Sequence, residues 1–403
     1  MSLTPVAEAL RLVLDPIEPI GDVLTIGLED AAGRVLAHDI VATRDQPPFP
    51  ASAMDGYAVR ARDVRVGEPL RLAGRSVAGK RFVGTLGADE AVRIFTGAPV
   101  PEGADAILIQ ENARTAGDAI VPTADVAVGR YLRPAGLDFG AGETLIVAGS
   151  TLDPGRLALI AAANQQQVVV RRTPRVALVA TGDELVPVGS TAGPDEIVAS
   201  SVVGVVAMLR DLGAEVFDAG IAPDDLAALD AVLGRALSFA PDLVITLGGA
   251  SVGEHDLVSD ALRARGVSLS FERIAMRPGK PLMHARDGVR SWLGLPGNPV
   301  SSLVCTHLFA LPLVARFQGR NWRPRTVEAV TADPLGENDE RQDYLRVMLR
   351  GRDPVVAHLP DRQDSSQLTR FAAADGLLVR PPFASPASAG TRHEVVVLRE
   401  WGE

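Results

Sequence analysis

The sequence is poor in cysteine, and this excludes an internal disulfide framework. Cys305 is the only cysteine among 403 residues, and it lies in the apolar run SSLVCTHLFAL. A chain without disulfides is typical of a reducing compartment. We therefore predict a cytoplasmic protein in which Cys305 is a buried, inert thiol.

Positive charge and long apolar runs are also scarce. The formal net charge is −10, which argues against nonspecific nucleic-acid binding, because that binding needs clustered Lys and Arg. No uncharged apolar stretch approaches the roughly 20 residues that span a bilayer. The first residues show neither the basic region nor the cleavage site of a signal peptide. We expect no nucleic-acid partner and no membrane.

Several common catalytic signatures are missing. The sequence has no His/Cys metal cluster, no G-x-S-x-G elbow, no Walker loop and no G-x-G-x-x-G. A triad hydrolase, a zinc site and a dinucleotide-binding fold therefore have no support.

The residues that are present predict several domains. Hydrophobic residues make up 47% of the chain, and its length exceeds what one core usually serves. A helix opens the chain, and short β-like runs occupy about 20–135. A helix and a strand at 153–172 are expected to pack with the opening helix. From 175 to 318 strands and helices alternate, which predicts a parallel-rich α/β sheet, and a β-barrel or sandwich closes the chain.

One predicted core strand, ITLGG, runs into a glycine-rich acidic turn. Gly248 and Gly249 let the backbone approach a ligand, Ser251 supplies a hydroxyl, and the next helix begins with an anion-attracting N-terminus. Glu254 and Asp256 have two interpretations that the residues alone leave open. They complement the helix dipole, or they hold Mg²⁺ beside a phosphate.

A second cluster, RIAMRPGKPLMHA, carries three cations around a Pro-Gly turn. Arg273, Arg277 and Lys280 fit a clamp for an oxyanion or a phosphate. A solvated surface turn explains the same residues, and the cluster taken alone favours that explanation.

Two further turns follow predicted strands of the same sheet. VATGDELV places Glu184 after one strand. LGLPGNPVSS places Asn298 as a helix cap, Pro299 at the first helical position, and Ser301 near free amides. VATGDELV and the earlier turn after ITLGG both carry acids and follow strands of this sheet. Together they predict a polar ligand site, because parallel sheets bind ligands at the carboxyl ends of their strands.

In their order along the chain, these motifs resemble those of the molybdopterin molybdenumtransferase family, to which the gephyrin E-domain belongs. The motifs are SAMDGYA, FTGAPVPEGAD, the G-x-D of Gly136 to Asp138, TGDEL, GGASVGEHD, RPGKP and GLPGNPVSS. The resemblance implies a homodimeric transferase of molybdenum cofactor biosynthesis. It would transfer molybdate to adenylylated molybdopterin and release AMP.

The resemblance also implies four domains. An elongated, discontinuous dimer domain would occupy 1–25 and 140–173, and a β domain 26–139. An α/β molybdopterin-binding domain would occupy 174–320, and a C-terminal β-barrel 321–403. The active cleft would form between the α/β domain of one subunit and the β domain of its partner.

Carried over position by position, the resemblance implies a set of site residues. The catalytic acids would be Asp256, Glu184, Asp55 and Asp138, the first two also holding Mg²⁺. The substrate-binding residues would be Thr96, Gly248, Gly249, Ser251, Asp224, Pro278, Gly279, Lys280, Pro296, Pro299 and Ser301. Molybdate would contact Arg277, Lys280, Arg341 or Arg346, and Ser366. The chain departs from the family at three positions. Ser201 stands where the family commonly has Asn, and Arg273 and Arg277 stand where it often has Lys. Arg in place of Lys keeps the positive charge and changes its geometry.

The implied chemistry is charge neutralisation around a phosphoanhydride. Mg²⁺ would polarise the anhydride while molybdate rests beside Arg277 and Lys280. Proton transfer by the acids is the alternative role. Two other functions compete: adenylyl transfer from ATP, against which the added N-terminal region and C-terminal barrel argue, and a noncatalytic molybdopterin carrier or scaffold. An adenylyltransferase and molybdoenzymes are the expected partners.

Overall fold

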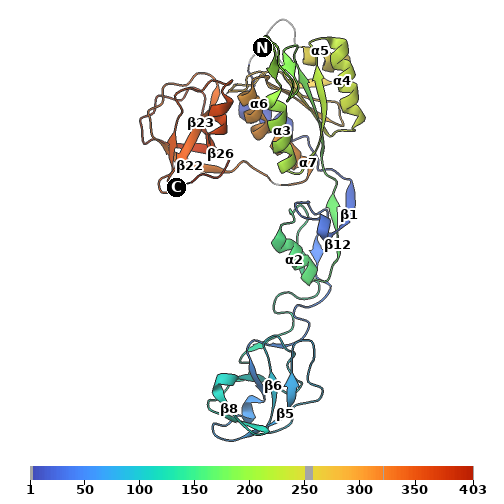
Figure 1. Ribbon diagram of the computed structural model, residues 1–403, viewed down its shortest axis with the longest axis vertical. Helices are drawn as coiled ribbons and strands as arrows, with labels where there is room; N and C mark the ends of the chain where they lie inside the picture. The colour runs from blue at the N-terminus through green and yellow to red at the C-terminus, as the bar shows by residue number, and fades with distance from the viewer. Residues whose placement is uncertain (1–2, 250–256, 321, 403) are drawn as a thin grey trace. The chain divides into compact units, whose positions relative to one another are not determined.

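The computed structural model describes residues 3–249, 257–320 and 322–402 (Figure 1). Internal contacts divide the chain into two compact units. Unit 1 comprises Met1–Leu24, Gly33–Val35 and Val170–Glu403, and unit 2 comprises Thr25–Ala32 and Leu36–Val169. The finer division into four domains stays a prediction.

Unit 2 is built on a six-stranded sheet with the strand order β7-β4-β6-β5-β9-β8. Its strands are β4 (Gly56–Val59), β5 (Leu70–Ser76), β6 (Glu90–Ile94), β7 (Ala106–Ile109), β8 (Ala113–Ala116) and β9 (Ala119–Pro122). Neighbouring side chains of a strand point to opposite faces. Accordingly, Tyr57 and Val59 belong to one apolar cluster, and Ala58 belongs to another. Both faces of this sheet are therefore buried along β4.

Shorter elements complete unit 2. They are β2 (Ile40–Val41), β3 (Ala51–Ser52), β10 (Leu132–Arg133), β11 (Thr144–Ile146), α2 (Pro154–Ala162) and 3₁₀ turns at Leu28–Asp30, Ala61–Asp63 and Gln110–Asn112. Helix α2 begins as its sequence predicts. The Asp153 carboxylate accepts a hydrogen bond of 2.9 Å from the Arg156 N–H, and Pro154 needs no partner at the first helical position.

The opening helix α1 (Val6–Leu14) lies in unit 1. Its residues Val6, Ala9 and Val13 join the core cluster that contains α7 (Leu311–Phe317). Helix α2 belongs to unit 2, and strand β12 (Gln167–Arg171) pairs with β1 (Val23–Gly27). The expected packing of 153–172 on the opening helix stays a prediction. Periodicity shows that a helix has an apolar face, but it does not show which neighbour covers that face.

The central sheet of unit 1 has the order β16-β13-β17-β21-β20-β18. Its strands are β13 (Arg175–Thr181), β16 (Glu215–Ala222), β17 (Leu243–Leu247), β18 (Ser268–Phe271), β20 (Met283–Arg286) and β21 (Ser291–Leu295). The pairs β13–β16, β13–β17 and β17–β21 are parallel, whereas β20 is antiparallel to both its neighbours. The predicted parallel-rich sheet is confirmed.

Helices cover both faces of this sheet (Figure 1). They are α3 (Ser200–Asp211), α4 (Leu226–Ser238), α5 (Leu257–Ala264) and α6 (Pro299–Cys305), which continues through a π-helical turn (Thr306–Ala310) into α7. Val176 and Leu178 of β13 pack in the cluster with α3, α6 and α7, and Ala177 and Val179 pack in the cluster with α4 and α5. The alternation along one strand thus builds the two apolar layers of the sandwich.

The continuous helix Pro299–Phe317 has the length and composition to cross a membrane, but 83% of its apolar window is buried inside the protein. Among the described residues it alone meets that test. Cys305 lies in this helix and is fully buried, and the burial raises the pKa of its thiol. The prediction of a buried, inert cysteine is confirmed.

The C-terminal part of unit 1 is a closed β-barrel. Its strands are β22 (Thr326–Thr331), β23 (Gln342–Arg350), β24 (Val356–His358), β25 (Gly376–Arg380) and β26 (Arg392–Val397), with helix α8 (Leu368–Ala372) between β24 and β25. The order β23-β24-β22-β26-β25 closes because β25 also pairs with β23. The short strand β19 (Met276–Arg277) joins the barrel from the α/β domain and pairs in parallel with β23. The predicted barrel is confirmed.

Candidate active site

Three parallel strands of the α/β domain end at one edge of the sheet. Turns that begin at Gly182, Gly248 and Pro296 follow β13, β17 and β21. The turn after β17 requires glycine, since Gly248 has φ +90° and a Cβ there would lie 2.5 Å from the Thr181 carbonyl oxygen. The three strand ends can therefore approach closely enough to share one ligand site.

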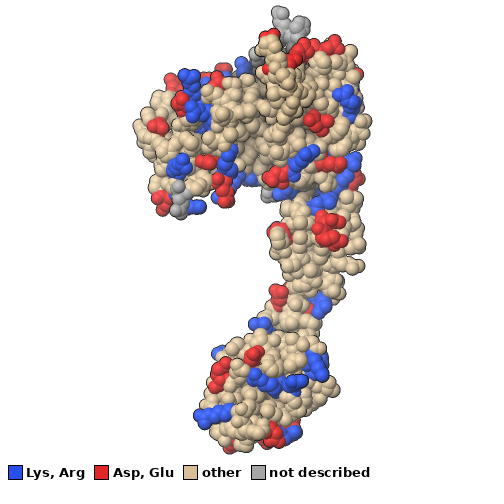
Figure 2. All heavy atoms as spheres, in the orientation of Figure 1, with Lys and Arg blue, Asp and Glu red and all other residues tan. Residues whose placement is uncertain are grey.

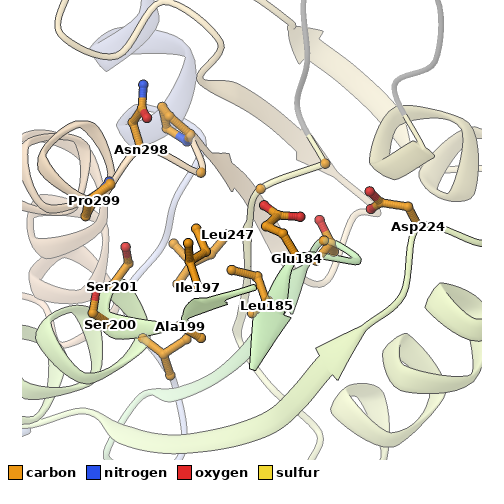
Figure 3. A pocket seen from close by; sticks show the side chains of 18 of the residues that line it. Glu184, Leu185, Ile197, Ala199, Ser200, Ser201, Asp224, Leu247, Asn298 and Pro299 are labelled. Atoms are coloured by element: carbon orange, nitrogen blue, oxygen red, sulfur yellow. The ribbon is translucent and has the colours of Figure 1, made fainter. Parts of the chain in front are cut away.

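A cavity of about 850 Å³ opens at these strand ends. Figure 3 shows the carboxylates of Glu184 and Asp224 on one side and Asn298, Pro299, Ser200 and Ser201 on the other, with Leu185, Ile197 and Leu247 between them. The cavity also takes in both glycines of the β17 turn, Pro296 and Lys280. Apolar walls with a few converging polar groups are typical of a small-molecule site.

Among the described residues, no hydrogen-bond or ion-pair partner neutralises the charged side chains of this cavity. Glu184 and Asp224 are exposed, and neither carboxylate accepts a hydrogen bond from any residue within 3–249, 257–320 and 322–402. The neighbouring Asp183 differs, because its carboxylate accepts the Asp224 main-chain N–H at 2.9 Å. Lys280 likewise forms no ion pair with the described part of the chain. Two anions and one cation therefore face the cavity without neutralising each other through a direct pair.

Thr181, the first residue of the TGDEL motif, adds a polar group that is absent from the predicted site residues. Its side chain lines the cavity, is only 4% exposed, and its hydroxyl has no hydrogen-bond partner among the described residues. Buried hydroxyls are normally paired, so this one is available to a ligand or to water. The sequence signal for it was the threonine at the end of a buried strand, directly before a glycine.

Other predicted site residues lie close to the cavity without lining it. Ser301 is buried in α6, and Pro278 and Gly279 form the turn that precedes Lys280. Gly279 has φ +121°, and a Cβ there would lie 2.7 Å from the Cys305 sulfur. These residues therefore shape the turn from behind, whereas Lys280 projects into the cavity lining.

The predicted molybdate contacts on the barrel are occupied by internal partners. Arg277 forms ion pairs with Asp343 and with Asp339, the latter at 3.3 Å. Arg341 pairs with Asp339 at 2.6 Å. The hydrogen bond from Arg341, and then the nearby charge of Arg277, hold the pKa of Asp339 at about 2.

Arg346 and Ser366 are also engaged within the barrel. Arg346 is buried and donates to the Gln363 side chain and to the Asp364 carbonyl oxygen, at 3.1 and 2.8 Å. The Ser366 hydroxyl donates to the Asp364 carboxylate at 2.6 Å. Their roles toward molybdate stay predictions.

Asn298 stands at the helix start as predicted, but its side chain does not cap α6. Its amide instead donates to the Ser365 hydroxyl at 3.1 Å, and the Val300 N–H donates to the Ser365 carbonyl oxygen at 3.2 Å. A barrel residue therefore satisfies the helix terminus that a local cap was expected to satisfy. Sequence position alone gave no signal for this long-range contact.

Unit 2 holds the remaining described candidates. The Asp55 carboxylate accepts two hydrogen bonds of 2.8 Å from Thr96, one from its main-chain N–H and one from its hydroxyl. These bonds lower the pKa of Asp55. Asp138 is exposed, and its N–H donates to the Gln46 carbonyl oxygen at 2.8 Å.

Two predicted residues, Ser251 and Asp256, lie outside the described residues, as does Glu254. The roles assigned to them stay predictions that rest on the sequence. The geometry of the candidate site is therefore carried by Glu184, Asp224 and Lys280.

Comparisons with known proteins cover nearly the whole chain. Residues 4–164 match the family model of the MoeA N-terminal region (domain I and II), residues 177–316 match a probable molybdopterin binding domain, and residues 328–398 match the MoeA C-terminal region (domain IV). The middle match contains the cavity that lies at the strand ends.

Relatives align over most of their length. The chain is 37% identical to the molybdopterin molybdenumtransferase of Haemophilus influenzae, over 80% of each chain, and 35% identical to that of a Nostoc species, over 99% of this chain and 93% of the relative. The crystal structure of a molybdopterin biosynthesis MoeA protein from Pyrococcus horikoshii superposes with a TM-score of 0.86 at 30% identity, covering 99% of this chain and all of the other.

Proposed function

The chain belongs to the molybdopterin molybdenumtransferase family, and from that premise we propose that it inserts molybdenum into molybdopterin in the cavity at the ends of β13, β17 and β21. It is a transferase of molybdenum cofactor biosynthesis. The observation that supports the proposed location is the meeting of Glu184, Asp224 and Lys280, all free of direct partners among the described residues, in the domain that matches the molybdopterin-binding model.

We propose adenylylated molybdopterin as the form of the substrate. The cavity combines apolar side chains, such as Leu185, Ile197 and Leu247, with the open backbone of Gly248 and Gly249. The apolar wall suits a flat heterocycle. The glycine turn lets main-chain N–H groups approach phosphate oxygens.

Glu184 and Asp224, the described acids of the cavity, fit a Mg²⁺ site. Within the described ranges no group of three or more His, Cys, Asp and Glu forms a protein-only metal site. Mg²⁺ commonly takes only one or two carboxylates and completes its shell with substrate phosphates and water. Glu184 and Asp224 match that pattern, and Asp256 is predicted to join them. When bound, the ion would offset negative charge on the phosphoanhydride.

The protein's own residues then bind and position. Lys280 supplies the positive charge for molybdate, and Thr181 supplies a hydroxyl at the floor of the cavity. The carboxylates of Glu184 and Asp224 orient the phosphate end of the substrate. The dithiolene sulfurs then replace oxo groups of molybdate, which leave as water, and hydrolysis of the phosphoanhydride releases AMP. No nucleophile paired with a base lines the described cavity, which favours catalysis by positioning and charge.

Further proposals concern the assembly and its setting. We propose a cytoplasmic homodimer in which Asp55, Thr96 and Asp138 act on the substrate bound by the partner subunit. An adenylyltransferase would deliver the substrate, and apo-molybdoenzymes would accept the product. On the face shown in Figure 2, Lys and Arg are interspersed with Asp and Glu, a distribution unlike the basic stripe of a nucleic-acid-binding surface.

AMP release from adenylylated molybdopterin tests the proposal. The full-length chain is expected to release AMP only when molybdate is added, and without ATP. Lys280→Met should slow this release by on the order of 100-fold, whereas Lys80→Met, which removes an exposed lysine of unit 2, should not. Undiminished release by Lys280→Met would place molybdate elsewhere.

The same assay separates the two alternatives. Formation of adenylylated molybdopterin from ATP would identify an adenylyltransferase. Tight pterin binding without turnover at saturating molybdate and Mg²⁺ would identify a carrier.

A further inference from the structure

The turn that carries Lys280 is held by the C-terminal barrel. Strand β19 leaves the α/β domain and pairs with β23 of the barrel, with Arg277 directly opposite Asp343. The Gln342 N–H donates to the Ala275 carbonyl oxygen at 2.9 Å. Only Pro278 and Gly279 lie between this pairing and Lys280, so the barrel fixes the start of the turn.

Arg277 is the side chain that joins the two parts most extensively. Its guanidinium pairs with Asp343 and Asp339, and it donates to the Asn338 side-chain oxygen at 3.2 Å. Directly opposite side chains on paired strands are well placed for such contacts. The planar guanidinium can serve several acceptors at once, which an ammonium group does less well.

Asp343 gives this contact its energetic importance. The residue is only 4% exposed, and one of its carboxylate oxygens has no partner among the described residues. The other oxygen faces Arg277. Removing the cation from a buried carboxylate is strongly unfavourable, so Arg277 is bound to the barrel even though 45% of its own side chain is exposed.

The far side of the turn is fixed by packing. Gly279 lies against Cys305 of α6 and against Met276. The Ile274 N–H donates to the Lys280 carbonyl oxygen at 3.0 Å. With its backbone held from the barrel and from α6, the turn leaves the side chain of Lys280 to face the cavity.

We propose that Arg277 and Asp343 form a clasp through which the barrel positions Lys280 in the cavity. Arg277 is then a positioning residue, and Lys280 is the cation that meets the anionic substrate. This inference rests on the proposed function only for the identity of that anion. The position of Lys280 can be measured without any substrate.

Lysine labelling provides that measurement, because the chain contains only two lysines, Lys80 and Lys280. An amine-reactive reagent applied to the full-length protein, followed by peptide mass spectrometry, gives the Lys280 rate relative to Lys80. Arg277→Gln and Asp343→Asn are each expected to raise this ratio by about three- to tenfold, because the turn opens more often. Arg392→Gln, which breaks the exposed pair with Glu328 in the same barrel, is the matched control and should leave it unchanged.

The double variant tests whether the two residues act as one unit. If they do, Arg277→Gln combined with Asp343→Asn raises the ratio no more than the larger single change. An unchanged ratio in Arg277→Gln overturns the clasp, as do independent, multiplying effects in the double variant. Arg277→Gln leaves the buried Asp343 carboxylate without its cation, whereas Asp343→Asn removes that charge. If Arg277→Gln fails to fold, Asp343→Asn carries the test alone, and an unchanged ratio in that variant overturns the clasp.

The molybdate dependence of AMP release separates a clasp from a direct ligand. Asp343→Asn leaves the charge of Arg277 in place. If Arg277 is a direct ligand, this variant should bind molybdate at least as well as the unchanged protein. If Arg277 is part of a clasp, the KM for molybdate should rise. Arg277→Lys should restore part of the molybdate affinity that Arg277→Gln loses. A raised labelling ratio with an unchanged KM would support the clasp and count against Lys280 as the molybdate-binding group of the proposed function.

Discussion

The acidic side chains that hold turns in unit 2 differ from those that line the cavity of unit 1. In unit 2, carboxylates accept hydrogen bonds from main-chain N–H groups of distant turns, at 2.6 to 2.9 Å, and examples are Asp39, Asp45, Asp55 and Asp105. In the cavity of unit 1, the carboxylates of Glu184 and Asp224 accept none from the described residues. A carboxylate oxygen that accepts an internal hydrogen bond helps to hold the fold, and one without such a bond can serve a ligand. Asp55 combines the two, because both bonds from Thr96 go to its Oδ1.

The largest effect is expected from removing the free acids. Glu184→Gln combined with Asp224→Asn should slow molybdate-dependent AMP release by on the order of 1000-fold, because no other described carboxylate lines the cavity to orient the phosphates. The melting temperature should change little, since neither carboxylate has an internal partner to lose.

Asp195→Asn is the matched control for that variant, because it neutralises an exposed acid of the same domain outside the cavity lining. Near-normal AMP release by the double variant would show that Glu184 and Asp224 do not serve the ligand. A large fall in melting temperature would show that these acids also hold the fold.

An intermediate effect is expected from lowering the pH, which should destabilise unit 1 more than unit 2. Burial lowers the pKa of His284 and of His307 to about 4, from 6.5. The unfolded chain therefore binds more protons than the folded chain between these values, so unit 1 loses stability as the pH falls from about 6.5 to about 4. The loss is about 3 kcal/mol for each histidine. In unit 2, the contribution of Asp55 persists until the pH falls below its ordinary pKa of 3.8.

Hydrogen–deuterium exchange at pH 7 and at about pH 4.5, corrected for intrinsic rates, measures this difference. Peptides from β17 and β21 should lose more protection than peptides from β4 and β6. His307→Leu should remove part of the acid sensitivity of unit 1, to which His284 and His393 also contribute, whereas His38→Leu, on an exposed residue of unit 2, should remove none. Equal losses in both units would contradict the assignment.

The sequence predicted the strand ends of the cavity and failed on its long-range contacts. Glu184, Gly248 and Lys280 each belong to a local motif, and the parallel connection of strands brings such motifs to one edge. Arg277 and Asp343 are 66 residues apart, and Asn298 and Ser365 are 67 apart. Local pattern carries no information on which barrel residue meets which turn, so the sequence predicts a ligand for Arg277 but not its ion pairs with Asp339 and Asp343.

The antiparallel strands of the sheet were missed for a related reason. The sequence predicts no strand at β20, whose Met283 and His284 appear only at the end of the cluster RIAMRPGKPLMHA around the Pro-Gly turn. Met283 and Ala285 are buried in the cluster with α4 and α5, and His284 is buried on the other face of the strand. A strand covered on both faces loses the alternation that sequence analysis depends on.

The smallest effect is expected from removing one of the two hydrogen bonds that Asp55 accepts from Thr96. Thr96→Val removes the hydroxyl that donates to Asp55 and keeps the main-chain N–H, which is the larger cause of the lowered pKa. The pKa of Asp55, followed by carbon-detected NMR, should rise toward 3.8 without reaching it. Thr115→Val, on the exposed strand β8, controls for the loss of a hydroxyl. If the pKa of Asp55 did not move, the hydroxyl would not be bonded to the carboxylate in solution, and the main-chain N–H of Thr96 would be the bond that lowers this pKa.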